Sequence, residues 1–259
     1  GGDDVCAILP LSTAFETADK IRQVYQLSYA QVTEKGSEAL LPKEQIGQAS
    51  SVEPNKDMAK IVMHLGHSDN QDETKISLSG AIIIAHHKQP LKEVIQTAHV
   101  VLDGVAKEKS GRNSLAIRLK KRSGGDRDVW FKWEEKNIFA LDGRTCRESF
   151  EKIISAARQK ELSASLLYKI ESLKESIEPL ASDLAQNKEL IVKLFEYEVA
   201  HSGFKSSAHE MAVDLAGLCI KVKSKDGKIY VADNWFNPEA AIIANFMAQK
   251  KKSGGERNA

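Results

Sequence analysis

Two almost wholly apolar runs limit what this chain can fold into. The first is Val5–Leu11 (VCAILPL) and the second is Ile76–Ala85 (ISLSGAIIIA). Runs of this length and composition are typical of strands that are buried on both faces of a sheet. Each run is followed by a helical pattern, which begins near Thr13 in one case and at Pro90 in the other. This alternation predicts a sheet with helices packed on it.

The pattern changes near residue 145. Before that point two more strands are expected, Ser114–Leu119 and Asp128–Trp133, whereas residues 36–74 are mostly polar and predict an irregular insertion. After it, apolar residues recur at helical spacing, with a hairpin signal at Lys225–Lys228. The sequence therefore predicts an α+β fold, with an α+β domain over residues 1–145 and a mainly α C-terminal domain over residues 146–259.

Charge and cysteine content argue against several classes of protein. The 259 residues carry 37 Lys and Arg against 36 Asp and Glu, so contact with RNA would need local patches or partner subunits. The three cysteines are far apart, which disfavours zinc and disulfides and predicts a cytoplasmic location. No stretch is long and apolar enough to predict a membrane span. The chain opens without Met inside an apparent hairpin, which indicates a piece of a longer protein.

The first four residues carry the strongest chemical signal. Gly1 and Gly2 allow a tight turn in which backbone amides can approach a phosphate closely. Asp3 and Asp4 add two carboxylates beside that turn, and Mg²⁺ or Mn²⁺ is bound by such carboxylates together with substrate phosphates. Taken alone, a Gly-Gly-Asp-Asp run is more often a type I′ turn with solvated aspartates, so its context decides.

The context supplies a resemblance to a known family. Ser79-Gly80 in the second apolar run and Ala106–Asn113 (AKEKSGRN) after the next helix resemble the palm-type nucleotidyl cyclases of the GGDEF class. The second aspartate, together with Ser79–Leu91 (SGAIIIAHHKQPL) and Asn113–Gly125 (NSLAIRLKKRSGG), is more similar to the large subunit of the type III-B (Cmr) CRISPR effector. The motifs of this resemblance lie in residues 1–34 and 75–125, and beyond residue 146 only a helical pattern is shared.

This resemblance implies a partial ferredoxin-like palm of the nucleotidyl cyclase type that binds ATP and magnesium. In the family, the assembled complex pairs its guide RNA with a target RNA, and the palm then joins ATP into cyclic oligoadenylates. The implied partners are ATP, the other subunits of the complex, and guide and target RNA through that complex. A further metal-binding aspartate precedes the glycine turn in the family, so this chain by itself is expected to be inactive.

Carried over residue by residue, the resemblance assigns a nucleotide site to this chain. Two residues would be catalytic and hold the metal, namely Asp3 and Asp4. Five residues would bind the nucleotide, namely Gly1, Gly2, Ser79, Gly80 and Lys107. The spacer between Lys107 and Gly111 is three residues, one longer than in the GGDEF pattern.

Two other functions are left open by the residues. The chain could be a non-catalytic scaffold that binds nucleotide without turnover, which ATP consumption would reveal. It could also be a GGDEF-like diguanylate cyclase, although Asp4 stands where a glutamate is expected.

Several further residues have two possible roles. His86 and His87 are expected to alternate on a strand, and Lys120–Arg122 could either contact a phosphate or end a charged strand. Trp130 and Trp133 are expected on opposite faces of a strand, with packing as the favoured role of both. Two cysteines in apolar runs, Cys6 and Cys219, are expected to be buried.

Overall fold

The computed structural model describes residues 5–27, 31–33, 36–38, 78–121, 124–204, 206–225 and 228–248. Helix α1 (Ala14–Leu27) comes first and is followed by a small antiparallel hairpin of β1 (Gln31–Thr33) and β2 (Gly36–Glu38). The rest of the predicted insertion lies outside the described residues.

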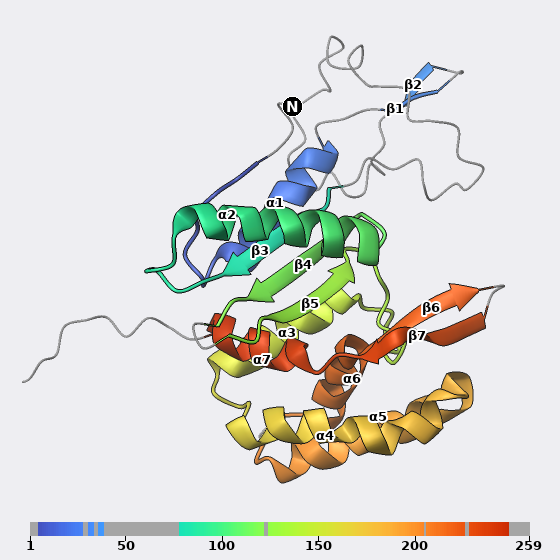
Figure 1. Cartoon of the computed structure of the whole chain (residues 1–259). Coiled ribbons are helices and arrows are strands. Elements are labelled where there is room, and N and C mark those ends of the chain that lie inside the picture. Colours follow the sequence, from blue (N-terminus) through green and yellow to red (C-terminus); the bar gives the residue numbers. More distant parts are fainter. Residues whose placement is uncertain are drawn as a thin grey trace, which may run out of the picture.

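A three-stranded sheet carries the first half of the described chain (Figure 1). Its strands are β3 (Gly80–Ile84), β4 (Ser114–Leu119) and β5 (Arg127–Lys132), in that spatial order. β3 and β4 are parallel, and they are joined by a helical crossover of α2 (Leu91–Val101) and η3 (Leu102–Lys109). β5 returns antiparallel to β4.

The side chains of β3 alternate between two apolar layers, as the pleat of a strand requires. Ala81 and Ile83 pack against the underside of α2 and η3, in a small cluster centred on Val101. Ile82 and Ile84 face the main core on the other side of the sheet. The near-continuous apolar run in the sequence is therefore explained by burial on both faces, as predicted.

The second half is mainly helical and adds one hairpin (Figure 1). Four of its helices begin at residues whose side chains accept a hydrogen bond from the first turn: Thr145, Ser163, Asp183 and Ser207. Its elements are α3 (Cys146–Arg158), α4 (Ala164–Ala181), α5 (Leu184–His201), α6 (Ala208–Cys219), β6 (Ile220–Lys225), β7 (Lys228–Phe236) and α7 (Glu239–Ala248). The hairpin expected at residues 225–228 is confirmed as the β6–β7 pair.

One apolar core joins the sheet to the helices. It extends from Phe15 in α1 through the inner face of the sheet to Met247 in α7. Phe150 of α3 lies at its centre, with its ring centroid 5.3 Å from that of Phe15 and 5.6 Å from that of Phe131. The mixed α/β character and the helical second half agree with the predicted fold class, and the domain boundary near residue 145 stays a prediction.

The outer edge of β5 is closed by side chains from the second half. The open edge of a sheet presents a row of unpaired backbone groups, with which other chains could pair. Here Asn237 donates its amide to the carbonyl of Asp128 at 2.9 Å, and Lys221 donates its ammonium to the carbonyl of Trp130 at 2.7 Å. Arg127 also forms an ion pair with Glu239 at the start of α7. These contacts fix the helical half against the sheet.

The strand predicted at Val5–Leu11 is wrong. Residues 5–10 form no strand, and their side chains are exposed, including 71% for Val5 and 82% for Ile8. Cys6, expected to be buried, is exposed as well. An apolar run becomes a buried strand only where another strand pairs with it, and no described strand pairs with this one.

Candidate functional site

Only part of the predicted nucleotide site lies in the described structure. Gly1, Gly2, Asp3 and Asp4 are outside the described residues, so the metal ligands and the glycine turn stay predictions. Ser79, Gly80 and Lys107 are described. Their places show which surface of the sheet the site would use.

Gly80 faces the core. A Cβ built on Gly80 would lie 3.2 Å from Leu115 Cδ1 and 3.7 Å from the six-membered ring of Trp133. The indole of Trp133 is buried and donates its Nε1 hydrogen to the carbonyl of Leu78 at 2.7 Å. The glycine therefore gives these two side chains room to pack, and any contact between Gly80 and a nucleotide would use its backbone.

Ser79 and Lys107 come to the same end of the sheet. Ser79 directly precedes β3, and it is two residues from Ala81, which packs under η3, so an extended chain places both on that face. Lys107 lies in η3, next to Ala106, which belongs to the same apolar cluster. Because β3 and β4 are parallel, the start of β3 and the end of the crossover helix lie at the same end of the sheet.

Lys107 already has an anionic partner in this structure. Its Nζ lies 2.8 Å from Asp103 Oδ1, one helical turn earlier. The hydrogen bond and charge of Lys107 lower the pKa of Asp103. Exposed pairs of this kind contribute little to stability, so the lysine can exchange Asp103 for a phosphate at small cost.

The longer spacer between Lys107 and Gly111 is accommodated as a π-helix. η3 is an eight-residue π-helix that continues α2, and the amide of Ser110 donates to the carbonyl of Val105 five residues earlier. A π turn takes up one more residue than an α turn, which matches the single extra residue in the motif. The helix predicted after Pro90 is thus confirmed, but its last two turns differ in type.

Three successive residues after η3 adopt positive φ angles: Gly111 at 82°, Arg112 at 66° and Asn113 at 47°. A glycine takes this conformation freely, whereas two non-glycine residues in a row are strained. The turn is held by bonds from the amide of Arg112 to the carbonyl of Ala106 and from the amide of Trp133 to the carbonyl of Asn113. Strain of this kind is concentrated at ligand-binding turns, and here it falls within the AKEKSGRN motif.

His86 and His87 do not lie on a strand. They follow β3 in a turn, both are exposed, and their ring centroids lie 4.3 Å apart with the ring planes tilted by 36°. The expected alternation across a strand is therefore wrong, because β3 ends at Ile84. Trp130 and Trp133, in contrast, lie on opposite faces of the sheet as predicted.

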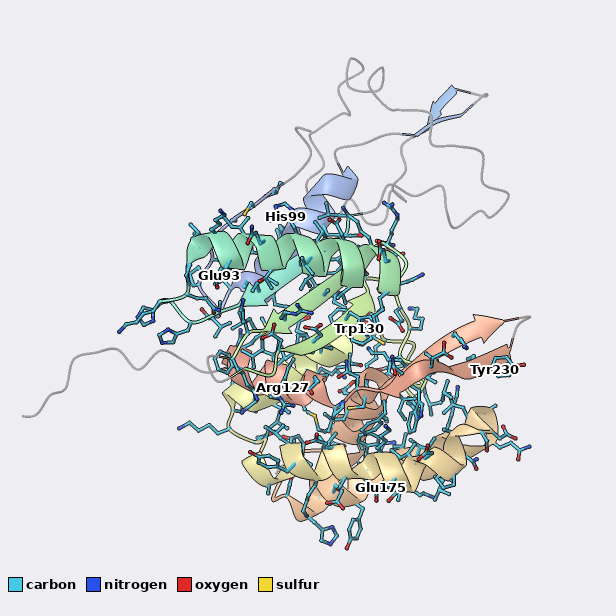
Figure 2. The ribbon with its side chains drawn as sticks, in the orientation of Figure 1. Glu93, His99, Arg127, Trp130, Glu175 and Tyr230 are labelled. Carbon is cyan, nitrogen blue, oxygen red and sulfur yellow. The ribbon has the colours of Figure 1, made fainter. Side chains whose placement is uncertain are left out.

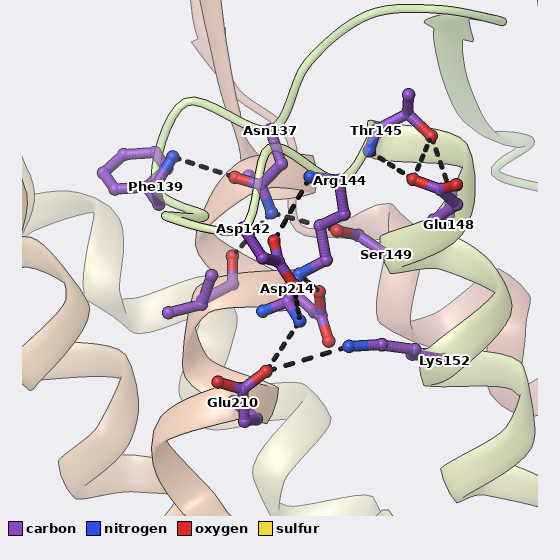
Figure 3. Close-up of polar contacts among 12 residues, drawn as sticks. Asn137, Phe139, Asp142, Arg144, Thr145, Glu148, Ser149, Lys152, Glu210 and Asp214 are labelled. Carbon is purple, nitrogen blue, oxygen red and sulfur yellow. Dashed lines mark hydrogen bonds and ion pairs between the residues drawn. The ribbon is translucent and has the colours of Figure 1, made fainter.

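A second polar cluster was not found from the sequence (Figure 3). It centres on Arg144, whose side chain is 7% exposed and lies 2.9 Å from Asp214 Oδ1, an ion pair with poor hydrogen-bond geometry. Arg144 also contacts Glu210 at 2.6 Å and Asp142 at 3.3 Å. Burial raises the pKa of Asp214 to about 6, despite the nearby Ser149 hydroxyl and Arg144. The cluster fixes the loop before α3 onto α6.

This cluster borders a surface pocket of about 680 Å³, which is lined by both acidic and basic side chains such as Lys136, Glu148 and Lys152. None of the three described nucleotide-site residues lines it. Among the described residues, no three His, Cys, Asp or Glu side chains gather in a way that could hold a metal ion. Asp142-Gly143-Arg144-Thr145 before a capped helix is the local signal for this cluster, but its partner Asp214 is distant in sequence.

Comparison with known proteins supports the resemblance seen in the motifs. Residues 55–116 match the family described as Cas10/Cmr2, second palm domain, and this range includes β3, α2 and η3. The match begins at residue 55, further upstream than the motifs indicated. The first four residues lie outside it.

The chain is also similar to the CRISPR system Cmr subunit Cmr2 of Pyrococcus furiosus, with 33% identity over 139 residues. The aligned region is 54% of this chain and 12% of the length of that relative. In the part of the chain that the structure describes, no helix is both long enough and apolar enough to cross a membrane.

Proposed function

Because this chain carries part of the second palm domain of a Cas10/Cmr2 large subunit, we propose that it acts within a type III CRISPR effector complex as a nucleotide-binding palm. In this proposal the palm binds ATP with Mg²⁺ and joins ATP into cyclic oligoadenylates when the complex engages target RNA. The observation that supports the proposal is the family match across β3, α2 and η3. These elements bring Ser79 and Lys107 to the same end of the sheet.

Four of the assigned residues have a defined part in this reaction. Asp3 and Asp4 would hold Mg²⁺, which lowers the barrier by stabilising the charge on the attacking 3′-oxygen and on the leaving pyrophosphate. Lys107 would bind a phosphate oxygen after leaving Asp103, and Ser79 would face the nucleotide from the start of β3. No protein nucleophile is required, because the substrate supplies its own hydroxyl and catalysis rests on positioning and charge.

The test uses the complex assembled with guide RNA, target RNA, ATP and Mg²⁺, with cyclic products separated by chromatography. The double variant Asp3→Ala and Asp4→Ala should lose the product while the complex still assembles. Lys107→Ala should raise KM for ATP more than it lowers kcat, because a phosphate contact made in the ground state contributes to binding. Asp103→Ala is the matched control, since it removes the partner of Lys107 and leaves the lysine.

Two results would contradict the proposal. Undiminished synthesis in the double aspartate variant would remove the metal role from Asp3 and Asp4. A wild-type complex that binds ATP without consuming it would instead favour the scaffold function.

A further inference from the structure

The helix that follows β3 changes type along its length, and its second part has the unusual geometry. Figure 2 shows this helix along the sheet, with Glu93 and His99 labelled on its first part, α2. The second part, η3, keeps π-type geometry over eight residues. π-helices are rare and mostly consist of a single turn, in which one residue more is held than in an α-helical turn. A π segment of this length therefore needs contacts that keep the extra residue in the helix.

The carbonyl of Ala106 supplies these contacts. In an α-helix this oxygen would accept from the amide of Ser110, four residues later. Here it accepts from the amide of Arg112 and from the hydroxyl of Ser114, which is fully buried. The amide of Ser110 instead donates to the carbonyl of Val105, five residues earlier, at 2.9 Å. Two donors from outside η3 thus take the place of one α-helical bond.

The turn after η3 is strained and leaves one polar atom unpaired. Gly111, Arg112 and Asn113 all have positive φ angles, and only the first of them is a glycine. The side-chain oxygen of Asn113 is buried and has no hydrogen-bond partner within the described chain. Left-handed non-glycine residues and unpaired buried acceptors each destabilise a structure. A longer turn would relax both, and the extra residue of η3 is the nearest source of length.

Contacts at both ends of η3 fix its position on the sheet. Val101, directly before η3, is buried in the small core together with Ala106. At the other end, Lys109 Nζ lies 3.8 Å from the centroid of the Trp130 ring. Trp130 belongs to β5 and is labelled in Figure 2. Its indole therefore reports where the last turn of η3 lies relative to the sheet.

We propose that η3 exchanges between this π form and an α-helical form that returns one residue to the turn. In the exchange, the amide of Ser110 passes from the carbonyl of Val105 to that of Ala106, which releases the two donors from outside the helix. The turn loses strain while a buried hydroxyl loses its acceptor, so the two effects oppose each other. Side chains in the last turn of η3 move around the helix axis by about 100°, the step of one residue.

The exchange moves Lys107, the residue of η3 that is assigned to the nucleotide site. Its ion pair with Asp103 is kept in both forms, because residues four apart are neighbours on an α-helix as well. The pair therefore turns as a unit relative to Ser79 at the start of β3. This consequence for nucleotide binding rests on the proposed function, whereas the exchange itself does not.

The test is chemical-exchange saturation transfer NMR on the nitrogen-labelled full chain, recorded without nucleotide. A minor state with a population of about 0.1–10% should appear at the amides of η3 and of the turn, and at the indole of Trp130. The amides of α5 are the internal reference and should show one state, because α5 packs against α4 and α6.

Two variants connect this minor state to its proposed cause. Deletion of Glu108 should abolish it, because the extra residue is gone, and the amide shifts of η3 in this variant should approach those of the wild-type minor state. Asn113→Gly should lower the minor population about threefold, because glycine relieves strain in the π form and removes the unpaired oxygen. Lys160→Gly is the matched control. It places glycine at another residue with positive φ, 60°, after α3, and should leave the exchange unchanged.

Three outcomes would overturn the proposal. A single state at all amides of η3 in the wild type would show that the helix does not exchange. A minor state that persists in the Glu108 deletion would not depend on the extra residue. Equal effects of Asn113→Gly and Lys160→Gly would show that strain in the turn after η3 does not set the population.

Discussion

Asn137 occupies the space beside Gly217 in the last turn of α6. A Cβ on Gly217 would overlap the Asn137 amide, so only glycine allows this approach. The amide nitrogen of Asn137 donates to Ser149 Oγ at 2.9 Å and to the carbonyl of Val213 at 3.0 Å. Its oxygen accepts from the amide of Phe139 at 3.0 Å. One buried side chain thus connects the loop after β5 to α3 and α6.

Gly217→Ala is expected to destabilise the protein strongly. The new methyl group would displace Asn137, combining an overpacking cost of about 1–3 kcal/mol with the loss of buried hydrogen bonds. The measurement is urea unfolding followed by circular dichroism. Gly104→Ala is the control, because a Cβ there meets nothing within 4 Å and the change should be neutral or stabilising. Equal stability of the two variants would contradict the role given to Asn137.

Asp214 is expected to make stability fall as the pH rises from about 4 to 6. Burial raises its pKa to about 6, whereas an exposed aspartate has a pKa of about 3.9. Between these values the folded state holds a proton that the unfolded chain has released, so this contribution is full below pH 4 and is lost through pH 6. Its size is about 1–3 kcal/mol.

The measurement compares the free energy of unfolding of the wild type and of Asp214→Asn across this pH range. Their difference isolates Asp214 from Glu148 and Glu210, whose lowered pKa values produce the opposite trend. Asp142→Asn is the control for losing an ion pair with Arg144, because its carboxylate is exposed. A difference that stays constant from pH 4 to 7 would show that Asp214 does not bind this proton.

The sequence predictions were correct where the residues that determine a structure lie within the segment itself. The bounds predicted for Ser114–Leu119 are those of β4. The apolar side chains that define this strand lie within the segment, and turns lie directly before and after it. The run Val5–Leu11 has the same apolar character and is not a strand, because pairing depends on residues elsewhere. Apolarity alone indicates that a segment can be buried, and the partner decides whether it is.

The candidate site shows the same limit. The motif identified Lys107 as a candidate site residue, but its pairing with Asp103 and the π geometry of η3 required the hydrogen bonds to be seen. Arg144 and Asp214 are joined only by the packing of α3 against α6, so no spacing in the sequence could reveal them. The roles of Asp3 and Asp4 stay predictions from the motif.

Deleting Glu108 is expected to be tolerated better than deleting Gln96. Glu108 is exposed in the π-helix, where one residue fewer lets the backbone close with ordinary α-helical bonds. Gln96 is equally exposed, but its loss rotates the following residues by about 100° and turns Val101 away from the small core. Thermal unfolding of both deletion variants makes the comparison, and a lower Tm for the Glu108 deletion would contradict this account.

The three thiols are expected to react at very different rates with an alkylating reagent. Cys6 is exposed, whereas Cys146 and Cys219 are buried, and burial raises the pKa of both to about 12. Since the thiolate is the nucleophile, at pH 8 these two thiols are ionised in only about one molecule in ten thousand and are also covered. Iodoacetamide should therefore label Cys6 within minutes and the other two only as the protein unfolds. Mass spectrometry of timed samples measures this, with Cys6→Ser as the control that should lose the fast phase. Fast labelling of Cys146 in that variant would show that the core around α3 opens readily, because no other route brings its sulfur into contact with the reagent.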